Sequence, residues 1–363
     1  MKVLRKAVLL FLKILNTLTL LGKEAKEIFV ITKMTEHVYI AHPSRVSRIN
    51  STTTIIVNAT YLSVIESQTD LFMAKELIAA IRKKISALPI RYLIFSHYHT
   101  DHILGAQAFL QENPSLIIIA QQQAARHIFL YAEDEKISWS ETVWQQSVAA
   151  RDSALSSISE ERKNYFSGLS DELGAYSKDI RSSAIILPNL TFYDSLILHD
   201  KNADLQLYFL GDGHTQGDII AMIPQDKVLV TGDLVHDYEP LFWNAHPDSW
   251  IEVLEKINVL DFEYFVGGHG DIHIGKDIIH SWLNYMKELK VKTIAAINKG
   301  LTLEAFLHEV NPDTFISLQN GYADRIQKFR LSYMNYFTGS LQDAIKAEIT
   351  DLWKFYEHHL KKD

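Results

Sequence analysis

Short apolar runs alternate with polar stretches along this chain, and four of the runs are followed at once by histidine or aspartate. These runs lie at residues 92–95, 207–210, 228–230 and 264–266 and are rich in leucine, β-branched and aromatic residues. Such runs predict buried strands. Because α/β sheets build their sites at the carboxyl ends of strands, we expect the polar residues that follow these runs to meet in one site.

The pattern in the first half of the chain predicts further strands and helices. Residues 27–67 alternate and are rich in Ile, Val, Thr and Tyr, which predicts a β-meander. Residues 71–87 have the spacing of an amphipathic helix, and a strand is expected at 116–120. The Gln-, Ser- and Glu-rich stretch at about 121–183 is almost without Gly and Pro, so we interpret it as a helical insertion.

Strands are expected to resume at residues 184–187 and near 190–193, and helices to dominate from 277 onward. The last part of the chain has six apolar residues on one helical face: Leu341, Ile345, Ile349, Leu352, Tyr356 and Leu360. This face is expected to pack on the body of the protein or on a second copy in a homo-oligomer. The sequence thus predicts an α/β (α+β) domain at 27–295 and a helical extension at 296–363.

The first 26 residues carry a different signal. Lys2, Arg5 and Lys6 precede a mostly apolar stretch, residues 7–21, which Lys13 interrupts. The stretch fits a signal sequence, an amphipathic helix at a membrane surface, or a helix packed on the protein's own core. We favour export, which predicts a periplasmic or secreted protein, with contact to a membrane surface as the second expectation and a cytoplasmic location otherwise.

Composition narrows the chemistry. The 363 residues include no cysteine, which excludes disulfides, thiolate metal ligands and cysteine nucleophiles. The formal net charge is −8, and no basic stripe is present, which argues against nucleic acid as a partner. A small-molecule substrate is the partner that we expect.

The side chains after the four strands are metal ligands by type. His97 and His99 stand two apart on an extended segment, so both can face one ion. Imidazole and carboxylate groups suit Zn²⁺ best, with Mn²⁺ or Fe²⁺ as less favoured occupants. The expected ligands, sufficient for two zinc ions per chain, are His97, His99, Asp101, His102, His214, Asp233 and His269.

In this order and spacing the motifs resemble the metallo-β-lactamase superfamily of hydrolases, over about residues 27–295. The resemblance implies a four-layer αβ/βα sandwich with the metals at one edge. It also implies that His97, His99 and His214 hold the first zinc, that Asp101, His102 and His269 hold the second, and that Asp233 bridges both.

A dinuclear zinc site can activate a shared water, so we predict a hydrolase that cleaves an ester, thioester, lactone or amide bond with a metal-bound hydroxide. Asp101 is the expected catalytic residue, because it can orient that hydroxide and accept its proton. The alternatives are β-lactam hydrolysis, an iron-containing sulfur dioxygenase, a nuclease, and a non-catalytic, membrane-associated binding protein.

The chain departs from the family pattern at several positions. Asp233 stands where the best-known zinc β-lactamases have cysteine, and His236 stands where they have a lysine that grips the drug. Leu104-Gly105 replaces a common Gly-Gly, and Glu66 replaces an Asp. Two neighbours of His214, Asp212 and Thr215, are expected to fix its ring. Wall residues of the substrate site are expected among Tyr238, Phe242, Trp243 and Trp250, and Trp139 and Trp144 are candidates for a lid.

Overall fold

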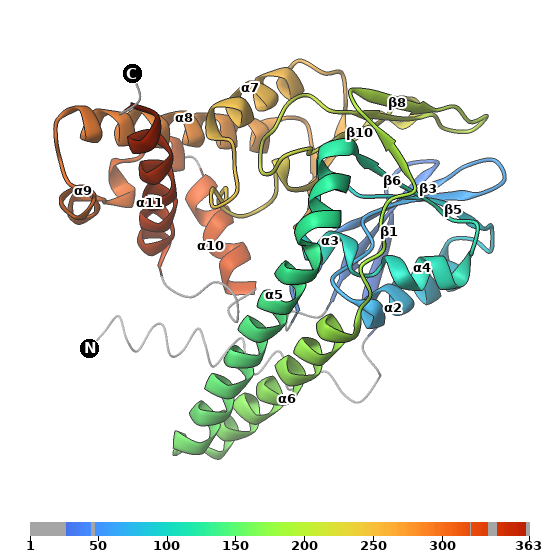
Figure 1. The fold of residues 1–363 in the computed structure, drawn as a ribbon, viewed down its shortest axis with the longest axis horizontal. Coiled ribbons are helices and arrows are strands. Elements are labelled where there is room, and N and C mark those ends of the chain that lie inside the picture. Colours follow the sequence, from blue (N-terminus) through green and yellow to red (C-terminus); the bar gives the residue numbers. More distant parts are fainter. Residues whose placement is uncertain (1–26, 45–47, 320, 333–339, 361–363) are drawn as a thin grey trace.

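The structure, a computed structural model, describes residues 27–44, 48–319, 321–332 and 340–360 (Figure 1). The predictions for residues 1–26 therefore lie outside the described residues. Within the described ranges, no helix is both long and apolar enough to cross a membrane.

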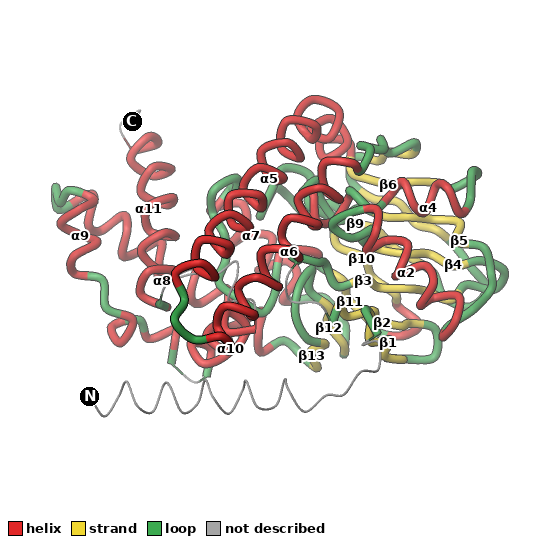
Figure 2. Tube along the Cα trace, turned by 90° about the horizontal axis from the view of Figure 1, so that it is seen from below, coloured by secondary structure: helices red, strands yellow, loops and turns green. Residues whose placement is uncertain are grey.

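The amino-terminal sheet has seven strands that lie side by side in sequence order. Its first four strands form the predicted antiparallel meander, and the remaining strands run parallel to the fourth. The strands are β1 Phe29–Lys33, β2 Val38–Pro43, β3 Thr53–Val57, β4 Leu62–Ile65, β5 Ile90–Ile94, β6 Ile117–Gln121 and β7 Leu190–Phe192. The helices α2, Leu71–Lys84, and α4, Ala106–Glu112, cover the outer face of this sheet (Figure 2).

The second sheet has six strands in the order β13-β12-β11-β10-β9-β8. Only β11 and β12 pair in parallel, and the other neighbours are antiparallel. The strands are β8 Ser195–Leu198, β9 Leu205–Tyr208, β10 Ile220–Ile223, β11 Val228–Val230, β12 Tyr264–Val266 and β13 Ile272–Ile274. The helices α7, Pro247–Asn258, and α8, Asp277–Asn298, cover its outer face.

Three apolar layers hold this sandwich together. Alternate side chains of the two sheets, such as Ile56, Ile94 and Val228, meet in a shared core between the sheets. The opposite faces pack against helices, for example Leu93 against α2 and Leu229 against α7 and α8. Strands buried on both faces read as continuous apolar runs, which explains the pattern that predicted them. The predicted four-layer αβ/βα sandwich, with a helical insertion and a helical extension, is confirmed.

The insertion is a long antiparallel helical hairpin that projects from the body (Figure 1). Its helices are α5, Gln122–Ser156, and α6, Glu160–Ser182. Small residues let the two helices approach closely: the Ser147 hydroxyl donates to the Ser170 carbonyl at 2.8 Å, and that of Ser177 donates to Ser140 at 2.7 Å.

The carboxyl-terminal helices are α9 Leu303–Glu309, α10 Tyr322–Ser332 and α11 Leu341–Leu360. The last helix of the described chain, α11, packs on α8, and α9 and α10 pack on α11, so the apolar face of α11 is covered by the body of the protein. Ile345, Ile349 and Leu352 of α11 are buried in the same cluster as Trp282 of α8. Short 3₁₀ turns complete the chain at η1 Pro224–Asp226, η2 Gly232–Leu234, η3 Pro312–Thr314 and η4 Ile316–Leu318.

One predicted strand is wrong. Residues 184–187 belong to no sheet, and they connect α6 to β7. Ile185 and Ile186 are only partly buried and pack against the outer cluster of the first sheet. The position beside β6 is occupied by Leu190–Phe192 instead, so the apolar run at 184–187 has no ladder to join.

Candidate metal centre

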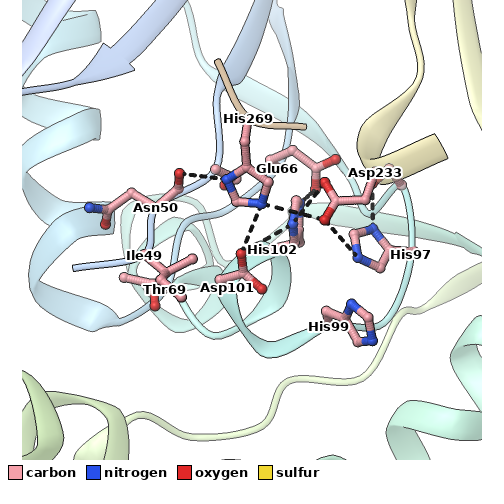
Figure 3. Close-up of polar contacts among 12 residues, drawn as sticks. Ile49, Asn50, Glu66, Thr69, His97, His99, Asp101, His102, Asp233 and His269 are labelled. Atoms are coloured by element: carbon pink, nitrogen blue, oxygen red, sulfur yellow. Dashed lines mark hydrogen bonds and ion pairs between the residues drawn. The ribbon is translucent and has the colours of Figure 1, made fainter. Parts of the chain in front are cut away.

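All seven predicted ligands come together at one edge of the sandwich, and Figure 3 labels all of them except His214. His97 and His99 lie in the loop after β5, and Asp101 and His102 follow in α3, Thr100–Ile103. The other three come from the second sheet: His214 from the loop after β9, Asp233 from η2 directly after β11, and His269 from the loop after β12. The four strand ends therefore meet as the sequence pattern predicts.

The ligand atoms form two groups, within each of which they lie no more than 4.8 Å apart. The first, here called the histidine group, contains His97, His99 and His214 together with Asp233, and the Nε2 atom of His214 is only 3.0 Å from Nδ1 of His99. The second, here called the Asp101 group, contains Asp101, His102 and His269. Its Asp101 Oδ2 atom is 3.3 Å from His102 Nε2 and 3.2 Å from His269 Nε2.

Asp233 is close to both groups. Its Oδ2 atom is 3.6 Å from His214 Nε2 and 3.4 Å from His269 Nε2, and its Oδ1 atom is 3.5 Å from His102 Nε2. One carboxylate thus faces nitrogen atoms of both groups, which is the arrangement that a bridging ligand requires.

The donor set fits metal ions better than it fits a hydrogen-bonded cluster. Within the described part of the chain, His97 Nε2, His102 Nε2 and Asp233 Oδ1 are buried and make no hydrogen bond. Polar atoms buried without hydrogen bonds cost free energy, and a coordinated cation would satisfy them. Nitrogen and carboxylate oxygen atoms in two adjacent groups suit two zinc ions.

Burial dominates the electrostatics of the histidine group. It lowers the pKa of His97 and of His99 well below the usual value, and it lowers the pKa of His214 to about 4. These three imidazoles are therefore neutral near pH 7, which is the state that binds metal.

The Asp101 group behaves in the opposite way. Burial alone would lower the pKa of His102 and His269, but Asp101 and Asp233 raise the pKa of His102 well above its usual value and that of His269 to about 9. Burial would likewise raise the pKa of Asp101, but the adjacent His102 and His269 hold it well below its usual range. Without metal, this group is a buried cluster of paired charges.

The loop after β4 supports the Asp101 group. Glu66 is buried in a left-handed conformation (φ 76°), and its Oε2 atom lies 3.2 Å from His102 Nδ1. This loop packs directly on α3: a Cβ on Gly105 would lie 1.8 Å from the Ser67 carbonyl oxygen. The glycine of Leu104-Gly105 is therefore required by the close approach of two backbones.

The loop after β12 fixes His269. The Nδ1 atom of His269 donates to the carbonyl oxygen of Asn50 at 3.0 Å, which turns Nε2 towards the carboxylates (Figure 3). A Cβ on Gly268 would lie 1.9 Å from Asp233 Oδ1, so only glycine fits there. Asn50 comes from a segment distant in sequence, and no local motif could have revealed it.

The prediction that Asp212 and Thr215 fix the ring of His214 is wrong. Asp218 organises this loop instead, accepting hydrogen bonds from the backbone N–H of Thr215 at 2.8 Å, from its hydroxyl at 2.6 Å, and from the N–H of Gly213 at 3.1 Å. Asp212 accepts from the N–H of Gly217. The signal that sequence reasoning missed is the second Gly-Asp pair, at Gly217-Asp218.

A cavity of about 510 Å³ opens above the ligands. It is lined by His99, Asp101, His214, Asp233 and His269 at its floor. The insertion helix α5 and the segment 238–243 form its walls. Of the expected wall residues, Trp139, Tyr238 and Trp243 line it, whereas Trp250 is buried in the core, and Phe242 and Trp144 do not line it.

His236 cannot take the role of the substrate-gripping lysine. It is completely buried, stacks on Tyr238 with ring centroids 3.5 Å apart, and packs edge-on against Trp282. It does not line the cavity. A substrate therefore does not reach this side chain.

The sandwich and the two ligand groups form a candidate metal centre, and comparison with known proteins identifies the family. Residues 49–269 match the family model of the metallo-beta-lactamase superfamily. The chain belongs to this superfamily, and the predicted class, a hydrolase of this fold, agrees with its relatives.

Two curated relatives are informative. The chain is 24% identical over 273 residues to a linear primary-alkylsulfatase of Pseudomonas sp., an alignment covering 69% of this chain and 48% of that protein. It is 28% identical over 97 residues to the metallo-beta-lactamase type 2 of Bacteroides fragilis, covering 25% of this chain and 39% of the relative. The chain thus spans about half the length, or less, of these relatives.

Solved structures show the same fold. The stereoselective inverting sec-alkylsulfatase Pisa1 from Pseudomonas sp. superposes with a TM-score of 0.63 at 15% identity, covering 90% of this chain and 50% of that chain. A metallo-beta-lactamase from Pontibacter korlensis superposes with a TM-score of 0.51 at 17% identity, covering 71% and 99%. The sulfatase match extends over more of this chain than the lactamase match does.

Proposed function

We propose that this protein is a dinuclear zinc hydrolase that cleaves an ester-type bond in a small molecule. The observation that carries the proposal is a pair of ligand groups that share Asp233 and form the floor of a 510 Å³ cavity. Bound zinc would lower the pKa of a water molecule towards neutrality and would polarise the bond under attack.

The residues around the floor have distinct tasks. Asp101 is the one carboxylate of the Asp101 group, it is partly exposed, and it lines the cavity, so it can orient a water molecule and accept its proton. Asp233 is almost fully buried and faces both groups, so it holds the two halves of the site in register. Trp243 stacks on His99 with ring centroids 5.0 Å apart and 6° between the planes, which orients that ring and excludes water from one side.

A sulfate ester is a second candidate substrate. The relationship to a linear primary-alkylsulfatase favours it, as does the similarity to a sec-alkylsulfatase that extends over the carboxyl-terminal helices. The carboxylic ester, thioester, lactone and amide bonds remain alternatives that share the same attack by activated water.

The deciding experiment combines metal analysis with matched substrates. We expect about two zinc ions per chain after reconstitution, since the two groups are complete. The rates of hydrolysis of a carboxylic ester and a sulfate ester of the same alcohol, of a thioester, of a lactone and of a β-lactam are then compared. The substrate that is turned over identifies the type of bond that the protein cleaves. Iron with dioxygenase activity, or two bound zinc ions with no turnover of any substrate, would contradict the proposal.

A further inference from the structure

The cavity wall differs in charge from its floor. Among the described residues, no lysine or arginine lines the cavity. Asp101 and Asp233 belong to the floor, where bound zinc would neutralise them. Glu135 of α5 is then the charged side chain that remains on the wall.

Glu135 belongs to a stripe along α5 that faces the cavity. The stripe consists of Glu135, Ser138, Trp139, Thr142 and Gln146, residues with the three- and four-residue spacing of one helical face. The Oε1 atom of Glu135 accepts a hydrogen bond from His127 Nε2 at 2.8 Å, which holds the carboxylate in place. The ring of His127 stacks on that of Tyr98, with centroids 3.5 Å apart. In the sequence Tyr98 stands between the expected ligands His97 and His99.

Aromatic rings line the same cavity as this carboxylate. Trp139 follows Glu135 by four residues, so the two side chains are neighbours on the helix. Tyr238 and Phe329, whose ring centroids are 4.9 Å apart, line the cavity as well, together with Trp243. A cavity that presents both a carboxylate and aromatic rings can recognise an ammonium group, through charge and through cation–π attraction.

We propose that this wall binds an amine or quaternary ammonium group of the substrate, at a distance from the bond that is cleaved. The inference rests on the proposed function for the reacting end of the substrate. A zinc-loaded floor attracts the electron-rich ester, and the wall, with Glu135 and no basic residue, attracts a cation. A substrate with a negative group at its far end would meet repulsion from Glu135 and no compensating partner.

The test uses three esters with one acyl group and one spacer, which end in trimethylammonium, in its neutral isostere tert-butyl, or in carboxylate. In the zinc-reconstituted protein we expect kcat/KM for the ester that ends in trimethylammonium to exceed that for the ester that ends in tert-butyl about tenfold or more. A cation–π site with a carboxylate provides a preference of this size. The carboxylate ester should be the poorest substrate.

Two variants assign the effect. Glu135→Gln keeps an acceptor for His127 but loses the charge, and it should reduce the ammonium-to-tert-butyl ratio about tenfold. Asp134→Asn makes the same charge change at the exposed neighbouring position, and it should leave the ratio as in the wild type. A wild-type ratio of one or less, or an unchanged ratio in Glu135→Gln, would overturn the proposal.

A binding measurement separates this proposal from the proposed function. Tetramethylammonium chloride, titrated against sodium chloride at equal ionic strength, should change the tryptophan fluorescence saturably, and Glu135→Gln should weaken this binding about tenfold. Binding without hydrolysis of any ester would support the ammonium site and contradict the hydrolase. Hydrolysis of the tert-butyl ester without tetramethylammonium binding would support the hydrolase and overturn the ammonium site.

Discussion

The two ligand groups differ in the protonation state of their histidines when no metal is bound. In the histidine group, burial keeps His97, His99 and His214 neutral, with their nitrogen atoms ready to bind. In the Asp101 group, His102 and His269 carry protons that the carboxylates stabilise. The first group could therefore bind a metal ion near pH 7 without releasing protons, whereas the second would have to release protons to bind one.

This difference has a structural cause. The histidine group has one carboxylate, Asp233, for three imidazoles, whereas the two imidazoles of the Asp101 group are near three carboxylates, those of Asp101, Asp233 and Glu66. We infer that the two sites fill in order, the histidine group first. The predictions below separate the two groups, beginning with the change that affects both.

Asp233→Ala should have the largest effect, because this carboxylate faces both groups. We expect zinc content to fall below one ion per chain and hydrolysis to fall below detection, measured by mass spectrometry of the metal and by initial rates. Asp226→Ala, which removes the partner of His37 outside the centre, is the matched control and should retain both ions. Full metal content in Asp233→Ala would refute the bridging role.

Asp101→Ala should separate the two groups. The histidine group remains complete, so we expect one zinc ion to stay bound. The rate of hydrolysis should fall by about 10²–10⁴, the usual contribution of a positioned proton acceptor. Asp101→Asn, which keeps an oxygen ligand but is a far poorer proton acceptor, should retain more metal than the alanine variant while losing similar activity. A fully active asparagine variant would exclude proton transfer through Asp101.

The pH dependence of zinc affinity should differ between the groups. The pKa of His269 is raised to about 9 and that of His102 is well above normal, so metal must displace these protons near pH 7. Affinity at the Asp101 group should rise up to about a hundredfold per pH unit while two protons are released, and the contribution of the His269 proton should level off above a pH of about 9. The histidine group should show almost no dependence over this range.

Competition with a chelator between pH 6.5 and 9 measures the zinc affinity of each group. Calorimetry in buffers of different ionisation enthalpy measures the number of protons released on binding. The stability of the metal-free protein should change in the opposite direction. A histidine whose pKa is raised on folding stabilises the folded protein fully at pH values below its pKa in the unfolded chain. This contribution is lost as the pH rises towards about 9, the pKa of His269 in the folded protein. Equal proton release from both groups would remove the distinction drawn between them.

The seven residues that come together at the candidate metal centre could be selected from the sequence, whereas the residues that support them could not. Each ligand lies in the loop or the short helix that comes after a strand, and this local pattern is visible in the sequence. Asn50, which orients His269, lies 219 residues away from it, and the contact depends on the packing of the two sheets. The apolar run at 184–187 resembled a strand because its apolar residues can be recognised from the local sequence alone. Whether a segment joins the sheet depends on strand pairing, and it is Leu190–Phe192 that pairs with β6.

A substitution of Glu66 is expected to have the smallest effect on the difference in zinc affinity between the two groups. The sequence marks it only as an acid in place of an Asp, but its left-handed backbone and its 3.2 Å approach to His102 Nδ1 make it a support of the Asp101 group alone. Glu66→Gln should lower zinc affinity at that group about tenfold, at the lower end of the effect of outer ligand contacts, and should leave the histidine group unchanged. Chelator competition measures it, with the exposed Glu161→Gln as control. Equal weakening of both groups would mean that Glu66 supports the fold of the whole edge and not one metal site.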